Sequence, residues 1–276
     1  MPQSALEAGR SAVVTGAASG IGLAACRRFA QLGMKICMVD VDEQGLSEAR
    51  QQIVNAAPGG DEDVLAVRTD VASKPDMASL KDTVYDAFGE VGLLMNNAVT
   101  QTTGGCWDSY DQWQRAMDVN LWGVINGVQC FVPAMLAQAT PCLIVNTGSK
   151  QGITNPPGKP AYNVCKAALN AYTECLQHEL RNHGDGLISA HLLIPGWTTT
   201  GNREHVQGAW TPDQVIDVLI AGLHNGDFYI LCADDEVSPE MDRKRILWAA
   251  HDIVDNRPPL SRWHPDYAQA FEEFSP

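Results

Sequence analysis

The stretch Thr15-Gly16-Ala17-Ala18-Ser19-Gly20-Ile21-Gly22 decides the fold, because it joins a short apolar run to the start of a helical segment. Residues 12–15 are predicted to form a buried strand, and residues 21–32 a helix. In such a turn Gly16 permits the sharp bend, Gly20 lets the backbone approach a pyrophosphate, and Gly22 lets helix and strand pack closely. The helix N-terminus offers unpaired N–H groups and a positive dipole end to phosphate. The run therefore predicts a dinucleotide site. Its Gly-x-x-x-Gly-x-Gly spacing departs from the usual Gly-x-Gly-x-x-Gly, so a plain structural turn is the alternative.

Beyond this turn, short apolar runs alternate with segments of helix length. Strands are predicted at 12–15, 35–40, 64–69, 92–95, 142–147, 187–194 and 228–232. Helices are predicted at 21–32, 43–55, 75–88, 107–138, 161–182, 212–223 and 239–255, the fourth bent or divided near Pro133. This alternation predicts an α/β fold, a single-domain Rossmann-type doubly wound parallel sheet of about seven strands. Residues 10–232 form the expected core. Residues 233–276 form a helical and aromatic C-terminal tail that packs over its own cleft or reaches a neighbouring subunit.

Composition narrows the classes of partner. The formal net charge of -14 over 276 residues disfavours nucleic acid and anionic membrane surfaces as partners. No uninterrupted apolar run reaches the ~20 residues of a membrane helix, and no signal peptide is visible, so a cytoplasmic protein acting on a small molecule is expected. The eight cysteines include no Cys-x-x-Cys pair, and several, such as Cys37 and Cys142, lie inside apolar runs, so free thiols that behave as small hydrophobes are expected and no metal site.

Asp40 ends the second predicted strand, about twenty residues beyond the glycines. A carboxylate there accepts hydrogen bonds from both ribose hydroxyls of NAD and repels the 2′-phosphate of NADP. The next residues, Val41, Asp42 and Glu43, add negative charge and no arginine. The sequence therefore predicts NAD as the cofactor, and the alternative is that Asp40 merely caps the next helix.

Tyr162 and Lys166 are four residues apart and share one face of the predicted helix 161–182. Ser149 follows the strand 142–147, at the carboxyl edge of the sheet where ligands bind in this architecture. A tyrosine has an ordinary pKa near 10, but a cation about 4 Å away favours the tyrosinate by roughly 4 kcal/mol near a protein surface. The set therefore predicts a tyrosine able to exchange a proton with an alcohol. A surface Tyr–Lys pair without function is the alternative.

Together these pieces resemble the classical short-chain dehydrogenase/reductase family over residues 10–232. The matching elements are the run from Thr15 to Gly22, Asp70-Val71, Asn96-Asn97-Ala98, Asn120, Ser149, Tyr162 with Lys166, and Pro195-Gly196. Two positions depart from the family pattern. Val99 stands where a glycine is usual, and Leu231-Cys232-Ala233-Asp234-Asp235 replaces the customary glycine-rich ending.

The resemblance implies a role for each matching residue. Tyr162 is the general acid/base, Ser149 binds the substrate oxygen, Lys166 lowers the pKa of Tyr162 and holds the nicotinamide ribose, and Asn120 holds a water that links Lys166 to solvent. The cofactor-binding residues that it implies are Gly16, Ser19, Gly20, Ile21, Gly22, Asp40, Asp70, Val71, Asn97, Tyr162, Lys166, Pro195, Gly196 and Thr198. A homodimer or homotetramer, formed through the helices 107–138 and 161–182, is also implied.

The expected substrate contacts are Ser149, Gln151 and Trp197, with Trp107 as a further part of the wall. Aromatic side chains offer large apolar area, so a bulky hydrophobic or aromatic secondary alcohol is predicted. The chain is also similar to bacterial dehydrogenases that act on benzylic alcohols of lignin-type aryl ethers. Two alternatives stay open: a noncatalytic NAD-binding scaffold or sensor, and a lyase or dehalogenase on the same fold.

Overall fold

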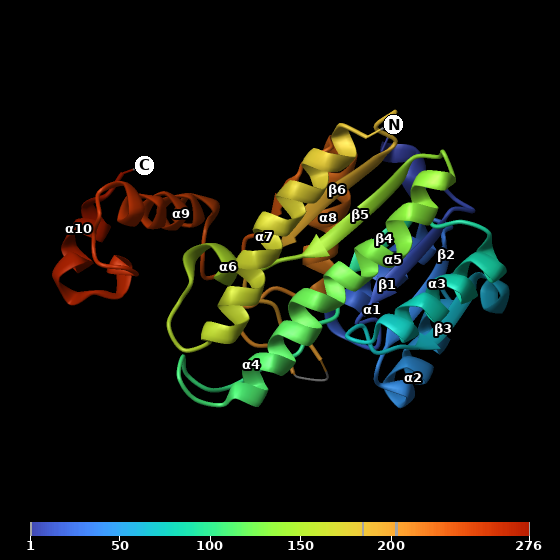
Figure 1. Ribbon diagram of the computed structural model, residues 1–276, viewed down its shortest axis with the longest axis horizontal. Coiled ribbons are helices and arrows are strands. Elements are labelled where there is room, and N and C mark those ends of the chain that lie inside the picture. Colours follow the sequence, from blue (N-terminus) through green and yellow to red (C-terminus); the bar gives the residue numbers. More distant parts are fainter. Residues whose placement is uncertain (1, 184, 202–203, 276) are drawn as a thin grey trace.

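A seven-stranded sheet forms the centre of the molecule (Figure 1). The computed structural model describes residues 2–183, 185–201 and 204–275. The strands are β1 Ser11–Thr15, β2 Lys35–Asp40, β3 Val64–Arg68, β4 Leu93–Asn96, β5 Cys142–Thr147, β6 Ile188–Ile194 and β7 Tyr229–Leu231. They pair in the order β3-β2-β1-β4-β5-β6-β7, and every pairing is parallel. This confirms the predicted doubly wound parallel sheet.

Helices cover both faces of the sheet. One face carries α1 Gly20–Gln31, α2 Glu43–Val54 and α8 Pro212–Asn225; the other carries α3 Lys74–Phe88, α5 Gly123–Ala137 and α7 Pro160–Arg181. The short helix η1 Pro2–Leu6 packs against α8 and β5, and η2 Gly60–Asp63 precedes β3. Neighbouring strand residues point to opposite faces, so Val13 packs with α3 and α5 while Val14 packs with α1. A sheet buried on both sides needs the continuous apolar runs that the sequence shows.

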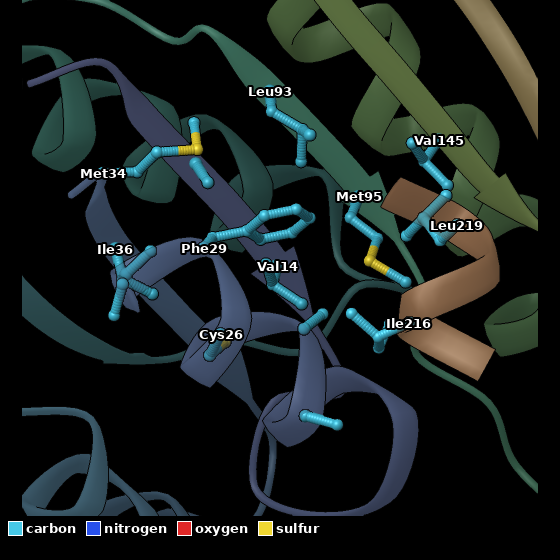
Figure 2. Packing of buried hydrophobic residues seen from close by; sticks show 14 of the residues in the cluster. Val14, Cys26, Phe29, Met34, Ile36, Leu93, Met95, Val145, Ile216 and Leu219 are labelled. Atoms are coloured by element: carbon cyan, nitrogen blue, oxygen red, sulfur yellow. The ribbon is translucent and has the colours of Figure 1, made fainter. Parts of the chain in front are cut away.

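Figure 2 shows the core beneath α1 and α8, where Phe29 packs among Met34, Val14 and Met95. Ile216 and Leu219 of α8 close the same cluster. Phe29 and Met95 are fully buried. Dense packing on this side fixes α1 against β1, and with it the glycine turn that joins the two elements.

The long helical region differs from the prediction at two points. It begins at Tyr110 rather than Trp107, because Ser109 has a φ of +54° that the helix cannot continue through; Trp107 lies in the preceding loop and is 94% exposed. It divides at η3, the π-helix Asp118–Trp122 between α4 Tyr110–Met117 and α5, whereas α5 runs on through Pro133. The predicted division at Pro133 is therefore wrong.

Residues Tyr110–Ala137 are long and apolar enough to cross a membrane by composition alone. Half of an apolar 18-residue window within that stretch is buried inside the protein. Phe131 and Met135 are fully buried against the sheet. The stretch serves as a core helix of this domain.

The tail forms a small helical lobe beside α6 Gln151–Thr154 (Figure 1). It contains α9 Pro239–Val254, η4 Ser261–Trp263, η5 Pro265–Tyr267 and α10 Ala268–Glu273. The buried Trp248 organises it, with Phe271 and Phe274 edge-on at 5.3 Å and Arg257 stacked 3.9 Å from its ring centroid. α9 packs on α6 of its own chain.

Candidate functional site

The strand order reverses between β1 and β4, and the crevice beyond their carboxyl ends is where ligands bind in such sheets. Asn97, just after β4, ties the two ends together. Its backbone N–H donates to Thr15 Oγ1 at 2.9 Å, and its side-chain amide donates to Thr15 O at 3.0 Å. Hydrogen bonds therefore hold the ends of β1 and β4 together at the crevice. The predicted cofactor residue Asn97 is part of that link.

The glycine turn after β1 has the backbone that its sequence predicts. Gly16 and Gly20 adopt left-handed φ values of +69° and +57°. A Cβ at Gly22 would lie 2.1 Å from Gly16 O, so α1 approaches β1 as closely as only glycine permits. Ser19 is the N-cap of α1 but makes no side-chain capping bond, and the first turn holds no acidic residue. This helix end is suited to an anion.

Asp40 faces the glycine turn from the end of β2. Its carboxylate accepts hydrogen bonds from the N–H of Ala18 at 2.9 Å and of Asp42 at 3.1 Å. The cap of α2 is Asp42, whose side chain accepts from the Gly45 N–H at 3.1 Å. The alternative in which Asp40 caps that helix is therefore wrong. The Asp40 carboxylate, a hydrogen-bond acceptor, lies beside the glycine turn.

Ser149 and Tyr162 meet at the carboxyl edge, where β5 ends and α7 begins. Burial raises the pKa of the half-buried Tyr162, and a side-chain hydrogen bond with Ser149 partly offsets that rise. Ser149 Oγ also accepts from the Gln151 N–H at 3.2 Å, which fixes the serine at the start of α6. Two hydroxyls predicted to act together are thus brought close enough for Ser149 to influence the pKa of Tyr162.

Lys166 lies one helical turn from Tyr162 and is almost fully buried. Its Nζ donates to Thr147 O at 2.6 Å and stands 5.7 Å from the centroid of the Tyr162 ring. Burial lowers the pKa of Lys166 to about 8. The lowering of the Tyr162 pKa by Lys166 stays a prediction.

Asn120 lies in the π-helix and is fully buried. Its amide oxygen accepts from the Thr100 N–H at 2.7 Å, and its amide nitrogen donates to Thr100 O at 3.0 Å. The side chain thus clamps the loop after β4. π-Turns are frequent at functional sites. The water-holding role of Asn120 stays a prediction.

The remaining predicted cofactor residues line the same edge. Asp70 Oδ1 accepts from the Ala72 N–H at 3.0 Å, and Val71 is buried so closely on α5 that a Cβ at Gly123 would lie 2.6 Å from its Cγ2. Beyond β6, Thr198 Oγ1 donates to Gly196 O at 3.2 Å. Trp197 is 45% exposed and available to a ligand.

Sequence reasoning missed a buried ionic cluster of Lys150, Asp234 and Asp242 behind Ser149. No spacing links residue 150 to residues 234 and 242, so no local signal could have found it. Among the described residues, no group of three or more His, Cys, Asp or Glu side chains is arranged to hold a metal ion.

Comparison with known families gives one family match over most of the chain. The family model described as short chain dehydrogenase matches residues 10–209. The 1-deoxy-11-beta-hydroxypentalenate dehydrogenase of Streptomyces exfoliatus is 32% identical over 268 residues, covering 92% of this chain and 94% of that protein. Two further curated relatives, the CLA biosynthesis dehydrogenase/reductase of Lactiplantibacillus plantarum and the "Putative oxidoreductase SadH" of Mycobacterium tuberculosis, are covered over 64% and 61% of their own length, less than two thirds.

Solved structures share the fold. A short chain dehydrogenase/reductase from Burkholderia phymatum in complex with NAD has a TM-score of 0.82 and 31% identity, covering 91% of this chain and 96% of that one. The LigO apo form from Sphingobium sp. strain SYK-6 has a TM-score of 0.78 and 28% identity, covering 97% of this chain and 95% of that one. The second match must include most of the C-terminal tail.

Proposed function

The chain belongs to the short-chain dehydrogenase family, and from that premise we propose that it is an NAD-dependent oxidoreductase interconverting a secondary alcohol and a ketone. The observation that carries the proposal is the meeting of Ser149, Tyr162 and Lys166 beside the glycine turn. The chain retains both the cofactor glycines and all three polar residues. A lyase, a dehalogenase or a noncatalytic scaffold would not require that combination.

The residues present fit NAD. The uncapped start of α1 suits the pyrophosphate, and Gly22 keeps the turn compact enough for close approach. Asp40 would accept hydrogen bonds from the adenosine ribose and oppose a 2′-phosphate, while the neighbouring Asp42 and Glu43 add negative charge. The complex of the Burkholderia relative with NAD supports the same choice.

Ser149, Tyr162 and Lys166 would carry out the proton transfer. Ser149 would hold the substrate oxygen, and Tyr162 would take the alcohol proton in oxidation and return it in reduction. Bound NAD would supply the hydride acceptor and a positive charge that favours the tyrosinate. Lys166 would leave Thr147 O for the cofactor ribose, bringing its ammonium nearer to the Tyr162 hydroxyl. Asn120 would hold a water that replenishes the proton.

We place the substrate among bulky hydrophobic or aromatic secondary alcohols. Trp197 follows the Pro195-Gly196 turn and keeps 45% of its surface exposed, while Gln151 begins α6 on the side of Ser149. The Streptomyces relative is named for a hydroxylated compound. A homodimer or homotetramer is part of the proposal. The exposed Trp122 and Val164 on the long helices are suited to that contact.

The test is NADH formation at 340 nm with a panel of aliphatic and aryl secondary alcohols, for wild type and Tyr162→Phe. Loss of general acid/base catalysis predicts a fall in kcat of about 10²- to 10⁴-fold with the Kd for NAD retained. Tyr172→Phe is the matched control, because Tyr172 lies on the same helix but is partly buried against the core cluster that includes α5 residues. Wild-type turnover by Tyr162→Phe would refute the proposed role.

A further inference from the structure

Lys150, Asp234 and Asp242 form the ionic cluster behind the site. Lys150 Nζ lies 3.1 Å from Asp234 Oδ2 and 2.5 Å from Asp242 Oδ2. Only 15%, 4% and 6% of the three side chains are exposed, respectively. Buried charges persist when they are paired, so each position depends on the others. The three residues come from distant segments: directly after Ser149, after β7, and the first turn of α9.

The cluster touches both segments that would flank the reacting atoms. The Lys150 N–H donates to Pro195 O at 3.2 Å, and the Trp197 N–H donates to Asp234 Oδ2 at 3.1 Å. A Cβ at Gly196 would lie 2.4 Å from Asp234 Oδ2 and 3.0 Å from Lys150 Cε. The Ser149 segment and the 195–198 turn are therefore fixed to one another through Lys150 and Asp234.

The same cluster anchors the tail. Asp242 belongs to α9, which packs on α6. Arg245 and Arg262, both from the tail, add positive charge near Asp242. Arg262 also stacks 4.6 Å from the Trp263 ring centroid, which connects the cluster to the rest of the lobe. The tail is thus joined to Lys150 through Asp242 and to α6 by direct packing.

We propose that Lys150 is a positioning residue through which the C-terminal tail, by way of Asp242, holds the Ser149 segment and the 195–198 turn in their working arrangement. The effect on turnover rests on the proposed function, whereas the coupling is a property of the protein alone. The cluster makes no contact with the glycine turn among the hydrogen bonds and ion pairs of the described residues. Its loss should therefore reduce kcat, and it should weaken NAD binding only as far as the displaced 195–198 turn contributes, since the glycine turn keeps its place.

Hydrogen–deuterium exchange on the NAD-free protein tests the coupling. Asp242→Asn should speed exchange across α9, and also at the Trp197 amide and over residues 149–154, which lie outside the tail. Lys150→Met should do the same. Glu240→Gln is the matched control, because Glu240 is an exposed acid in the same helical turn. Its exchange should match wild type at all three places.

Steady-state kinetics test the consequence. Each variant should lose about 10- to 100-fold in kcat, the range expected of a misplacement approaching 1 Å. The KM for NAD should rise by less than the fall in kcat, because only the 195–198 part of the cofactor site is displaced. The double variant should be no worse than Lys150→Met alone, because both changes break one path. Exchange that rises in α9 only, or in neither variant, refutes the coupling. If Lys150→Met does not fold, the exchange of Asp242→Asn still tests the coupling, because that variant keeps the Lys150–Asp234 ion pair. A wild type that binds NAD but oxidises no alcohol overturns the proposed function, while the exchange result stands.

Discussion

Replacing Gly22 by alanine tests whether the closeness of α1 to β1 is what builds the dinucleotide site. The new Cβ would lie 2.1 Å from Gly16 O and 2.8 Å from Asn97 Nδ2, whereas ordinary contacts begin at 3.4 Å. The helix or the turn must therefore retreat by about 1.3 Å at the oxygen. Both neighbours are held in place, Gly16 O by the backbone and the Asn97 amide by Thr15.

Overpacking of this kind costs about 1–3 kcal/mol in the free energy of unfolding. We expect Gly22→Ala to lower the urea midpoint accordingly and to weaken NAD binding at least 10-fold, because the turn amides move with the helix. Urea unfolding and calorimetric titration with NAD measure the two effects. Gly105→Ala is the control: its Cβ would meet Asp108 oxygens at 3.5 Å and 3.6 Å, in ordinary contact. A Gly22→Ala protein with the midpoint and Kd of wild type would refute the reasoning.

Three further changes give distinct outcomes. Asp40→Asn should weaken NAD binding about 10- to 100-fold, since hydrogen bonds to charged groups contribute about 1.5–3 kcal/mol. It should also reduce the ratio of the Kd for NADP to the Kd for NAD. Measuring both Kd values for wild type and variant checks this. Burial lowers the pKa of Lys166 from 10.5 to about 8 in the folded protein. Between pH 8 and 10.5 the unfolded chain therefore keeps the Lys166 proton while the folded protein has lost it. The free energy of unfolding should rise with pH across that window. Urea unfolding of wild type should show the free energy of unfolding rising by about 3 kcal/mol across that window, and Lys166→Met should lack this rise. Wild type and variant with the same pH dependence would contradict the prediction. Asn120→Ala leaves both polar groups of the Thr100 backbone without their partner and should cost about 1–3 kcal/mol in urea unfolding; an unchanged midpoint would show that the clamp is dispensable.

Local sequence patterns were enough to predict most strands and helices of the fold. The predicted strands 35–40 and 142–147 coincide with β2 and β5, because apolar runs bounded by turn residues determine a buried strand. Ser149, Tyr162 and Lys166 could be grouped beforehand, since a strand end and one helical turn place them without knowledge of the rest of the fold.

Features that depend on distant packing were not predictable. The start of α4 is set by the left-handed Ser109, and nothing in its neighbours requires that conformation. The break at η3 coincides with the Asn120 clamp on Thr100, a contact across 20 residues of chain. α6 was missed because four residues are too few for a periodic pattern. The cluster around Lys150 arises only once the tail has docked.

The distribution of the cysteines makes the protein convenient to label. Five of the eight thiols are buried and Cys130 is half-buried, while Cys106 and Cys175 are exposed. Burial raises the pKa values of Cys37 and Cys232 to about 12, which keeps them from reacting as thiolates. Maleimide dyes should thus attach at two positions, and at one in Cys175→Ser. Cys106 adjoins the exposed Trp107 in the loop before α4, so a fluorophore there would report whether the surroundings of that loop change when an alcohol is added.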